Sequence, residues 1–469
     1  MSELPDGIEP APIPEPIDSA LGIVVAKRDD RCAVLLGRRS RRARFMPGNL
    51  VFPGGKLDAD DDPLLQGAFE RCASRELLEE AGLDLPPEAW RSAGERTTPP
   101  LFPVRFRTAF FVAELPPGVE LPTTPPSPDE IETLSFADPR EVLADWESGR
   151  ALVPPPILPI LRLIAAGPYG DPAALAAQIG TVNAEESASP RIEFIPGFWV
   201  LPVRTRTLPP ASCTNVWMPG GGRFVVIDPG SALADDNEQL LTVIARRVAQ
   251  GGRVEAIVLS HHHRDHVEGV DAIARALSIP VWAHAETFAR IAALPKTVPT
   301  RTLADGDTLD LDGTVLRVLH TPGHAPGHLA FFDDRRRALL AGDLVSGLST
   351  ILVGPADGDM SGYLDSLRRV AALDPKTVFP SHGPPLPAAS LAATIAHREK
   401  REAGILAVLA DGVARGLSAI ANEAYAEAPV TPAFLREMQT RAHLEHLIGR
   451  GLAEKTPDGY RIPGTSIMS

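Results

Sequence analysis

Four potential metal ligands are crowded into the segment Ser260–Gly269, which reads S-H-H-H-R-D-H-V-E-G. They form the pattern H-x-H-x-D-H, made by His261, His263, Asp265 and His266. Borderline divalent metals such as zinc take imidazole nitrogen and carboxylate oxygen as ligands. The pattern follows the apolar run Ile257–Leu259, which is typical of a buried strand. The segment therefore predicts a metal anchor just past the end of a strand.

Three further residues of the same chemical types stand in similar positions later in the chain. His324 ends H-T-P-G-H, Asp343 ends A-L-L-A-G-D, and His382 lies in P-S-H-G. Each comes after a short apolar run and within a turn that contains Gly or Pro. Because α/β sheets place ligand sites beyond the ends of their strands, we expect these segments to converge on one edge.

A second set of charged ligands lies in the first half of the chain. The stretch Ala68–Ala81 has helical character and ends at Gly82. Within it, Glu76, Glu79 and Glu80 are spaced i, i+3 and i+4, so the three carboxylates share one helical face. Hard oxygen ligands of this kind indicate Mg²⁺ or Mn²⁺, which reaches a substrate through its phosphates. The alternative is a solvated helix face with no metal.

A basic run precedes these glutamates and consists of Arg38, Arg39, Arg41, Arg42 and Arg44. Guanidinium groups bind phosphates through paired hydrogen bonds, so Arg39 and Arg44 are candidates for holding the diphosphate of a substrate. A charge run of this kind equally describes a solvated loop.

Composition limits the class of protein. The 469 residues suggest two to four folding units, and 44% hydrophobic with 23% charged residues is typical of globular protein. The net charge of -14 gives no general attraction to nucleic acid or to anionic membranes. Three unpatterned cysteines, an acidic N-terminus and the lack of a long apolar stretch predict a cytoplasmic protein with no membrane partner.

The chain divides into five regions. We expect a disordered arm over 1–17, an α/β domain over 18–170, a polar linker over 171–190, a second α/β domain over 191–395 and a C-terminal domain over 396–469. All twelve histidines lie at or after His261, so the two α/β domains are expected to use different metal chemistry.

Strands are predicted in the first domain at 19–27, 32–36 and 106–112, with closing helices at 139–149 and 158–164. In the second, strands are predicted at 199–203, 215–217, 224–227 and 254–259, and a helix at 238–249. Helices at 392–409, 417–425 and 432–450, followed by a hairpin within 452–462, predict a winged helix at the C-terminus. Its nearly balanced charge does not support strong duplex binding, and RNA contact and a protein-contact or lid role remain open.

The first domain resembles the Nudix family of diphosphate hydrolases in its R-E-x-x-E-E-x-G stretch and the upstream Phe52–Gly55. The resemblance implies that Glu76, Glu79 and Glu80 bind Mg²⁺ or Mn²⁺, that Glu79 is catalytic, and that Arg75 orients a glutamate. The spacing from Gly55 to Arg75 is longer than in the usual box. Its usual upstream glutamate would fall near Gly67.

Further residues resemble the motif of the coenzyme A diphosphatase subgroup, which implies a small-molecule diphosphate as substrate. They are Leu35–Leu36, Arg39–Ser40, Arg44, Gly48, Phe52–Gly55 and Asp58. Gly37, Ala43 and Met46 depart from that motif.

The second domain resembles the metallo-β-lactamase fold family, because Asp228, the H-x-H-x-D-H pattern and the three later ligands match its motifs in chain order. The resemblance implies an αββα sandwich with two Zn²⁺ ions at one edge. The first would be held by His261, His263 and His324, and the second by Asp265, His266 and His382. Asp343 would bridge both ions, Asp265 would also act in catalysis, and Asp228 would support a ligand histidine. We assign structural roles to His262, His284 and His320, and leave His328 out of the ligand set.

The C-terminal half also resembles the β-lactamase-like protein 2 branch of this fold, some members of which cleave single-stranded RNA. The resemblance rests on Gly358–Met360, Ser366–Leu367, His382 and His397–Glu402. It implies phosphate contacts by Arg398 and Arg401, for which an ion-paired helix surface is the alternative.

The leading hypothesis is a fusion of two hydrolases. One is a two-zinc, endoribonuclease-like phosphodiester hydrolase, and the other is a Nudix-like diphosphatase acting on coenzyme A or a nucleotide diphosphate. An alternative keeps the zinc site but makes the substrate an acyl thioester, as in hydroxyacylglutathione hydrolases. In a third hypothesis the Nudix-like half is a binding module without turnover. A homodimer is among the expected assemblies.

Overall fold

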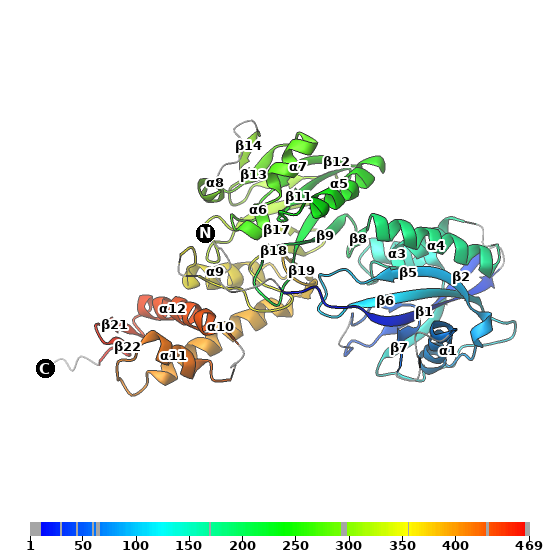
Figure 1. Cartoon of the computed structure of the whole chain (residues 1–469), viewed down its shortest axis with the longest axis horizontal. Coiled ribbons are helices and arrows are strands. Elements are labelled where there is room, and N and C mark those ends of the chain that lie inside the picture. Colours follow the sequence, from blue (N-terminus) through cyan, green and yellow to red (C-terminus); the bar gives the residue numbers. More distant parts are fainter. Residues whose placement is uncertain are drawn as a thin grey trace. The chain divides into compact units, whose positions relative to one another are not determined.

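The computed structural model describes residues 11–28, 31–43, 46–58, 61, 66–167, 170–291, 298–354, 356–427 and 431–464 (Figure 1). These residues form two compact units. The N-terminal unit comprises Pro12–Leu201 with Gln239–Gln250, and the C-terminal unit comprises Pro202–Glu238 with Gly251–Ser469. Within the described ranges, no helix combines the length and the apolar character needed to cross a membrane.

The N-terminal unit is built on a seven-stranded sheet in the order β3-β2-β1-β6-β5, with β4 paired to β1 and β7 to β2. The central pair β1 and β6 is parallel, whereas β1 and β2 are antiparallel. The strands are β1 (Ile17–Arg28), β2 (Arg31–Arg39), β3 (Leu50–Val51), β4 (Gly54–Lys56), β5 (Arg91–Thr97), β6 (Phe106–Glu114) and β7 (Ile131–Ala137). The strands predicted at 19–27, 32–36 and 106–112 are thereby confirmed as β1, β2 and β6.

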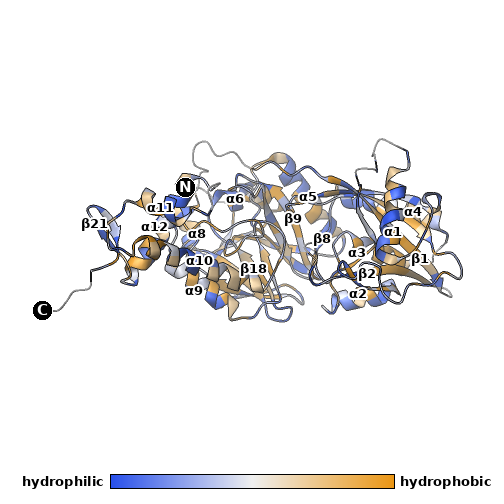
Figure 2. Cartoon of the chain, turned by 90° about the horizontal axis from the view of Figure 1, so that it is seen from below, coloured by the Kyte–Doolittle hydropathy of each residue, from blue (hydrophilic) through white to orange (hydrophobic). Residues whose placement is uncertain are grey.

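Helices cover both faces of this sheet because side chains alternate along each strand. Ile23 and Val25 of β1 join the core formed with α2 (Pro139–Glu147), α3 (Ile157–Ala166) and α4 (Pro172–Ala188). Val24 points to the other face, into the core formed with α1 (Ala68–Ala81). A short 3₁₀ helix, Pro87–Ala89, precedes β5. Figure 2 shows β1 coloured mainly as hydrophobic, as expected for a strand covered on both faces.

The helix predicted at 68–81 is α1, and Gly82 ends it in the left-handed conformation with φ of 66°. Only glycine adopts this conformation without steric cost, which explains why the helix stops there. Gly82 donates a backbone hydrogen bond of 2.9 Å to Leu78.

The linker predicted at 171–190 is wrong, because most of it folds as α4. The Asp171 side chain caps the helix by accepting from the backbone N–H groups of Ala173 and Ala174, both at 2.9 Å. The buried Asn183 then donates a 2.8 Å hydrogen bond to the carbonyl of Ala93 in β5. The cap and the small side chains favour a packed helix over a free linker. The region predicted as an arm is described from residue 11, and Ile17 already begins β1; residues 1–10 lie outside the described residues.

The C-terminal unit contains two sheets. One runs in the order β14-β13-β12-β11-β10, and the other in the order β15-β16-β17-β18-β19-β20. The strands of the first are β10 (Cys213–Pro219), β11 (Arg223–Ile227), β12 (Arg253–Val258), β13 (Val281–Ala283) and β14 (Thr300–Thr302). Those of the second are β15 (Thr308–Asp310), β16 (Val315–His320), β17 (Leu329–Asp333), β18 (Ala338–Gly342), β19 (Thr377–Pro380) and β20 (Leu386–Pro387).

The remaining elements of this part of the chain agree with the predicted alternation of strands and helices. Before β10, β8 (Ile192–Glu193) pairs antiparallel with β9 (Phe198–Arg204). The helices are α5 (Ala234–Ala249), α6 (Arg264–Val267), α7 (Val270–Leu277), α8 (Ala285–Arg290) and α9 (Met360–Ala371). The four strands β9 to β12 correspond to those predicted at 199–203, 215–217, 224–227 and 254–259. Helix α5 corresponds to the helix predicted at 238–249.

The two sheets meet through buried contacts between β10 and β19. The Asn215 amide donates to the carbonyls of Pro380 and Gly383 at 3.0 and 2.8 Å, and the Trp217 indole donates to Pro380 at 3.0 Å. The ring centroids of Trp217 and Phe379 lie 4.9 Å apart. These contacts fix the ends of strands from both sheets beside one another, and α9 packs on the outer face of the second sheet.

The C-terminal region follows His382 and contains three helices and a hairpin, as predicted. These are α10 (Ala389–Val408), α11 (Leu417–Ala424), α12 (Ala433–Gly449), β21 (Glu454–Thr456) and β22 (Gly459–Arg461). Ile405, Leu409, Ile420, Leu444 and Leu447 form their shared core. Its assignment as a winged helix stays a prediction.

Candidate metal centre

The seven residues predicted as metal ligands in the C-terminal unit come from four segments, each just beyond a strand. His261 and His263 follow β12, and Asp265 and His266 lie in the short helix α6. The other three follow β16, β18 and β19 and are His324, Asp343 and His382. The two packed sheets bring all seven to one edge, as the sequence indicated.

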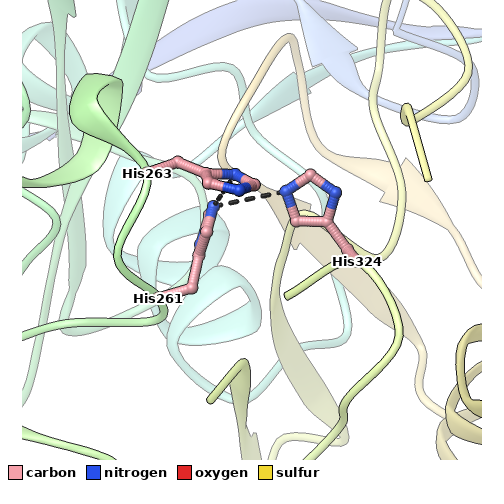
Figure 3. A group of neighbouring side chains, drawn as sticks. All are labelled: His261, His263 and His324. Atoms are coloured by element: carbon pink, nitrogen blue, oxygen red, sulfur yellow. Dashed lines mark hydrogen bonds between the residues drawn. The ribbon is translucent and has the colours of Figure 1, made fainter. Parts of the chain in front are cut away.

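Three histidines form the first group of potential ligands. The Nε2 atom of His261 lies 2.9 Å from Nδ1 of His263 and 3.3 Å from Nε2 of His324. Figure 3 shows the three rings turned so that these nitrogens face one another. The potential ligand atoms of this group all lie within 4.8 Å of one another, a spacing that one cation could bridge.

A second group consists of Asp265, His266 and His382, which satisfy the same distance limit. His382 Nε2 lies 3.5 Å from Asp265 Oδ2, and His266 Nε2 lies 3.9 Å from Asp265 Oδ1. The carboxylate of Asp343 lies between the two groups. Its Oδ2 is 3.4 Å from His324 Nε2 and 3.6 Å from His266 Nε2, and its Oδ1 is 3.5 Å from His382 Nε2.

Hydrogen bonds to the outer ring nitrogens fix the direction in which four of the histidines present Nε2. Nδ1 of His324 donates to the carbonyl of Leu352 at 2.8 Å, and Nδ1 of His382 donates to that of Cys213 at 2.9 Å. The other two are held by polar side chains: His261 Nδ1 lies 3.0 Å from Ser260 Oγ, and His266 Nδ1 lies 2.9 Å from Asp228 Oδ2. Because Nδ1 makes these contacts, Nε2 is the ring nitrogen left to bind a cation.

Asp228 supports two potential ligands, His266 directly and His261 through Ser260. Its carboxylate accepts from the backbone N–H of Ser260 at 2.7 Å and from the Ser260 hydroxyl at 2.5 Å, besides its contact with His266. Asp228 is buried, and its backbone φ of 55° is unusual for a residue other than glycine. Its position agrees with the supporting role predicted for it.

The donor set fits a pair of zinc-like cations. Nε2 of His266 and Oδ1 of Asp343 are buried atoms without a hydrogen-bond partner, although such atoms in a protein interior normally have one. Imidazole nitrogen with a few carboxylate oxygens is the ligand chemistry of zinc, whereas magnesium favours oxygen alone. A metal pair would satisfy these orphan atoms.

The electrostatics of the site depend on burial and on the mixture of carboxylates and imidazoles. Burial and neighbouring imidazoles hold the pKa of His324 at about 4 and that of His261 well below its usual range. For His266 burial acts in the same direction, but the carboxylates of Asp343, Asp265 and Asp228 outweigh it and raise the pKa. Binding of a cation at His266 would therefore displace a proton.

His328, which the sequence analysis does not include among the metal ligands, holds the backbone of Asp343 in position. The backbone N–H of Asp343 donates a 2.9 Å hydrogen bond to His328 Nε2, and His328 Nδ1 lies 2.8 Å from the hydroxyl of Thr321. Burial lowers the pKa of His328 to about 3, so the ring is neutral. The P-G-H sequence, which places the ring directly after a turn, was the only sequence signal for this role.

Asp357 is another residue that the sequence did not single out. Its Oδ2 lies 3.3 Å from Nε2 of His262 and 3.8 Å from Nε2 of His263. Hydrogen bonds with His263, together with the charge of His262, lower the pKa of the Asp357 carboxyl. The rings of His284 and His320 stack on each other, with their centroids 4.2 Å apart. This contact is in keeping with a structural role for both residues.

A pocket of about 230 Å³ opens on the metal centre. Five of the potential ligands line it: His263, Asp265, His324, Asp343 and His382. Its apolar wall comes from Leu208 and Ala211, from Ile351 and Leu352, and from Phe434, Leu435 and Met438 of α12. Among the described residues that line the pocket, Arg206 is the only arginine or lysine.

The phosphate contacts predicted for Arg398 and Arg401 do not fit their positions, because neither residue lines the pocket and both are buried. Arg398 donates to Gln439 Oε1 at 2.8 Å and to the carbonyl of Ile351. Arg401 stacks on Tyr425, with 3.8 Å between its guanidinium carbon and the ring centroid, and donates to the carbonyl of Ala424. The surface ion-pair alternative also fails for Arg398, whose side chain is held by neutral acceptors.

The glutamates of α1 are less closely gathered than the histidine site. In the described part of the chain, some groups of three His, Cys, Asp or Glu residues have potential ligand atoms that all lie within 4.8 Å of one another. The three glutamates do not form such a group. Glu80 is buried and accepts a 3.0 Å hydrogen bond from the backbone N–H of Gly54, and burial raises its pKa to about 7. Burial also raises the pKa of Glu76, whereas the Glu79 side chain is about half exposed.

Arg75 holds the glutamate cluster together. Its guanidinium lies 2.9 Å from Glu76 Oε1 and 3.2 Å from Glu79 Oε2, which agrees with the orienting role predicted for it. It also contacts Asp58 and Asp61, at 3.4 and 3.5 Å. The neighbouring Gly55 is needed for close approach, since a Cβ there would lie 2.3 Å from Glu76 Oε1.

Of the two arginines predicted to hold a diphosphate, Arg44 lies outside the described residues. The positive charge of Arg39 acts on Glu80 and lowers its pKa, against the effect of burial. Nε of Arg39 is a buried atom without a hydrogen-bond partner. Arg39 therefore lies near the glutamates.

Comparison with known proteins identifies two families in the chain. The model of the metallo-beta-lactamase superfamily matches residues 206–382, and that of the NUDIX domain matches residues 16–154. A Beta-lactamase-like protein 2 homolog of Caenorhabditis elegans is 28% identical over 231 residues, which cover 46% of this chain and 72% of the relative. A hydroxyacylglutathione hydrolase of Acidiphilium cryptum (strain JF-5) is 32% identical over 160 residues, covering 34% of this chain and 59% of that protein.

A solved structure of a beta-lactamase domain protein from Burkholderia ambifaria has the same fold. It superposes with a TM-score of 0.51 at 21% identity and covers 59% of this chain and 94% of the solved one.

Proposed function

The chain joins a NUDIX domain to a metallo-beta-lactamase superfamily domain, both of them hydrolase families, and on that premise we propose that its C-terminal unit is a two-zinc hydrolase. The observation that carries the proposal is the arrangement of His261, His266, His324 and His382. Each has its outer nitrogen engaged, and each presents Nε2 to the carboxylate of Asp343 or to a ligand beside it. We further assign the unit an αββα layering and its last three helices a winged-helix fold.

The residues of the chain have distinct roles in this proposal. His261, His263 and His324 would hold one zinc ion, Asp265, His266 and His382 would hold the other, and Asp343 would be shared between them. Bound zinc supplies a water of lowered pKa as nucleophile and a positive charge beside the attacked group. Asp265, which lines the pocket, would orient that water and accept its proton. Asp228 and His328 keep His266 and Asp343 in position.

An acyl thioester is the substrate class that the pocket favours. Apart from the residues assigned to the metal ions, the charged side chains among the described residues that line it are Asp357 and Arg206. A nucleic-acid backbone is bound chiefly through several cationic side chains, and the chain carries a net charge of -14. A thioester carries no charge at the reacting group, and its acyl chain suits an apolar wall. The similarity to a hydroxyacylglutathione hydrolase supports the same class.

Single-stranded RNA is the second candidate, supported by the resemblance to the β-lactamase-like protein 2 branch and by matches such as the Caenorhabditis elegans relative. The inward position of Arg398 and Arg401 removes the phosphate contacts that the sequence suggested for it. Among the described residues that line the pocket, Arg206 is then the one cationic side chain that could bind the phosphodiester beside the zinc ions.

The proposal is tested by comparing S-lactoylglutathione and single-stranded RNA as substrates, with and without a chelator. We expect chelator-sensitive hydrolysis of the thioester and a loss of about 100-fold or more in kcat/KM for His263→Ala, because His263 supplies one ligand of the first ion. His284→Ala, outside the centre, is the matched control. Hydrolysis that persists at the wild-type rate in His263→Ala would refute the two-zinc assignment.

For the N-terminal unit we propose a diphosphate hydrolase in which Glu76, Glu79 and Glu80 bind Mg²⁺ or Mn²⁺. The support is the convergence of Arg75, the half-buried Glu76 and the buried Glu80 on the turn at Gly54–Gly55. Arg39 would bind the substrate's diphosphate. The alternative, a binding module without turnover, predicts diphosphate binding with no product.

Glu79→Gln separates these two possibilities. Glu79 is the most exposed of the three glutamates, so the substitution removes a ligand charge with little effect on packing. We expect at least about 100-fold slower manganese-dependent hydrolysis of coenzyme A or ADP-ribose. Glu88→Gln, in the 3₁₀ helix, should retain wild-type activity. Absence of any turnover by the wild-type protein would leave the binding-module hypothesis.

A further inference from the structure

The pocket wall contributed by α12 is held in a fixed position next to the metal centre. Phe434, Leu435 and Met438 are half-buried apolar residues that line the pocket, and their spacing puts them on neighbouring turns of one helix face. The adjacent Gln439 is buried and accepts a 2.8 Å hydrogen bond from Arg398. The wall is therefore anchored from behind by α10.

Arg398 also holds a second segment of the pocket wall. Arg398 also donates to the carbonyl of Ile351, and the carbonyl of the next residue, Leu352, accepts from Nδ1 of His324. Ile351 and Leu352 both line the pocket. One short segment thus carries apolar pocket surface and also orients a metal ligand. An apolar group on this wall lies beside the reacting centre, because both belong to one pocket.

We propose that α12 and Ile351–Leu352 form a subsite for a linear aliphatic acyl chain, so that the enzyme selects thioesters by chain length. The inference rests on the proposed hydrolysis of thioesters in the C-terminal unit. Straight apolar chains fit a wall made of leucine, isoleucine and methionine side chains with one phenylalanine. A nucleobase would instead be recognised by stacking on aromatic side chains as well as by hydrogen bonds, and Phe434 is the one Phe, Tyr or Trp among the described residues that line the pocket.

The reaction itself is a simple hydrolysis. Water oxygen forms a bond to the acyl carbon, and the carbon–sulfur bond breaks. One proton of the water ends on the thiol sulfur, and the second is released when the carboxylic acid product ionises. The acyl chain takes no part in these steps, so chain length acts only through binding in the subsite.

Thioesters of N-acetylcysteamine are suitable probes, because they contain no diphosphate on which the NUDIX domain could act. Full-length protein with zinc is assayed with acetyl, butyryl, hexanoyl and octanoyl thioesters. Burial of each methylene that enters the subsite should raise kcat/KM roughly fourfold, and the octanoyl probe should exceed the acetyl probe at least about tenfold.

Met438→Gln tests the wall with a side chain of similar length and similar helix propensity. We expect the octanoyl-to-acetyl ratio of kcat/KM to fall at least about fivefold, because a polar group then faces the acyl chain. Glu445→Gln, an exposed position on the same helix, should keep the wild-type ratio. Melting temperatures of both variants show whether α12 stays folded. Equal kcat/KM for the acetyl and octanoyl probes, or a ratio unchanged in a folded Met438→Gln, overturns the subsite.

Calorimetric binding of the octanoyl thioester to metal-free protein separates this inference from the proposed function. If no probe is hydrolysed but the wild-type protein binds the octanoyl thioester and Met438→Gln binds it at least about fivefold more weakly, the subsite stands and thioester hydrolysis is refuted. If hydrolysis occurs without a chain-length preference, thioester hydrolysis stands and the subsite is refuted. Absence of both hydrolysis and binding refutes both.

Discussion

Replacing Asp343 with asparagine is expected to lower kcat/KM for hydrolysis by the C-terminal unit at least about 1,000-fold and to reduce the zinc content from two ions to one or none. Asp343 is the carboxylate that faces both groups of ligands, with oxygens 3.4 to 3.6 Å from Nε2 of His324, His266 and His382. Asparagine keeps the size of the side chain but loses the negative charge that offsets two cations. Metal analysis and kinetics on the same preparation measure both effects.

A control for Asp343→Asn is available one strand earlier in the sequence. Asp334 is an exposed carboxylate just after β17 that pairs with Arg317 at the surface, and Asp334→Asn should change neither zinc content nor rate. Retention of two zinc ions and a rate within tenfold of wild type in Asp343→Asn would show that this residue does not bridge the ions.

Replacing Arg398 with methionine is expected to destabilise the C-terminal unit by about 2 to 4 kcal/mol, seen as a melting temperature lower by roughly 4 to 16 °C. Only 2% of the Arg398 surface is exposed. Its guanidinium satisfies Gln439 and Ile351 and lies 5.3 Å from the ring centroid of Tyr363. Methionine preserves the apolar stem and removes a buried charge, which is favourable. Two buried acceptors are left without donors, and we expect that cost to dominate.

Two further variants test whether the effect of Arg398→Met comes from the hydrogen bonds of this buried guanidinium. Arg398→Lys retains the charge but not the forked geometry, so its melting temperature should be intermediate. Arg441→Met changes an exposed arginine of α12 and should leave stability within about 0.5 kcal/mol of wild type. An unchanged melting temperature for Arg398→Met, measured by calorimetry on the full-length chain, would contradict the anchoring role.

Much of the metal centre could be predicted from the sequence because its ligands follow short apolar strands in a fixed chemical pattern. His261 to His266 are close in the chain, and the later ligands are marked by Gly and Pro turns. The supporting contacts were harder to foresee. The hydrogen bond from Asp343 to His328 and the approach of Asp357 to His263 depend on loop conformations that residue types alone do not specify.

The apolar pocket wall could not be predicted because its parts lie far apart in the chain. Leu208, Ile351 and Met438 meet only after the sheets and the C-terminal helices have packed. The prediction for Arg398 fails for a different reason: arginine is rarely buried, so a basic stretch on a helix indicates a surface position. The segment 171–190 was judged by its polar composition, although Asp171-Pro172 is a signal for the start of a helix.

The order of these parts along the chain has a consequence for biosynthesis. Every candidate zinc ligand up to His382 leaves the ribosome before α12 is made, since α12 begins at Ala433. A nascent chain can therefore acquire its ions while the side of the pocket that faces the substrate is still missing. Competence to cleave would then precede discrimination among substrates, and synthesis of α12 would be the step that completes the proposed acyl-chain subsite.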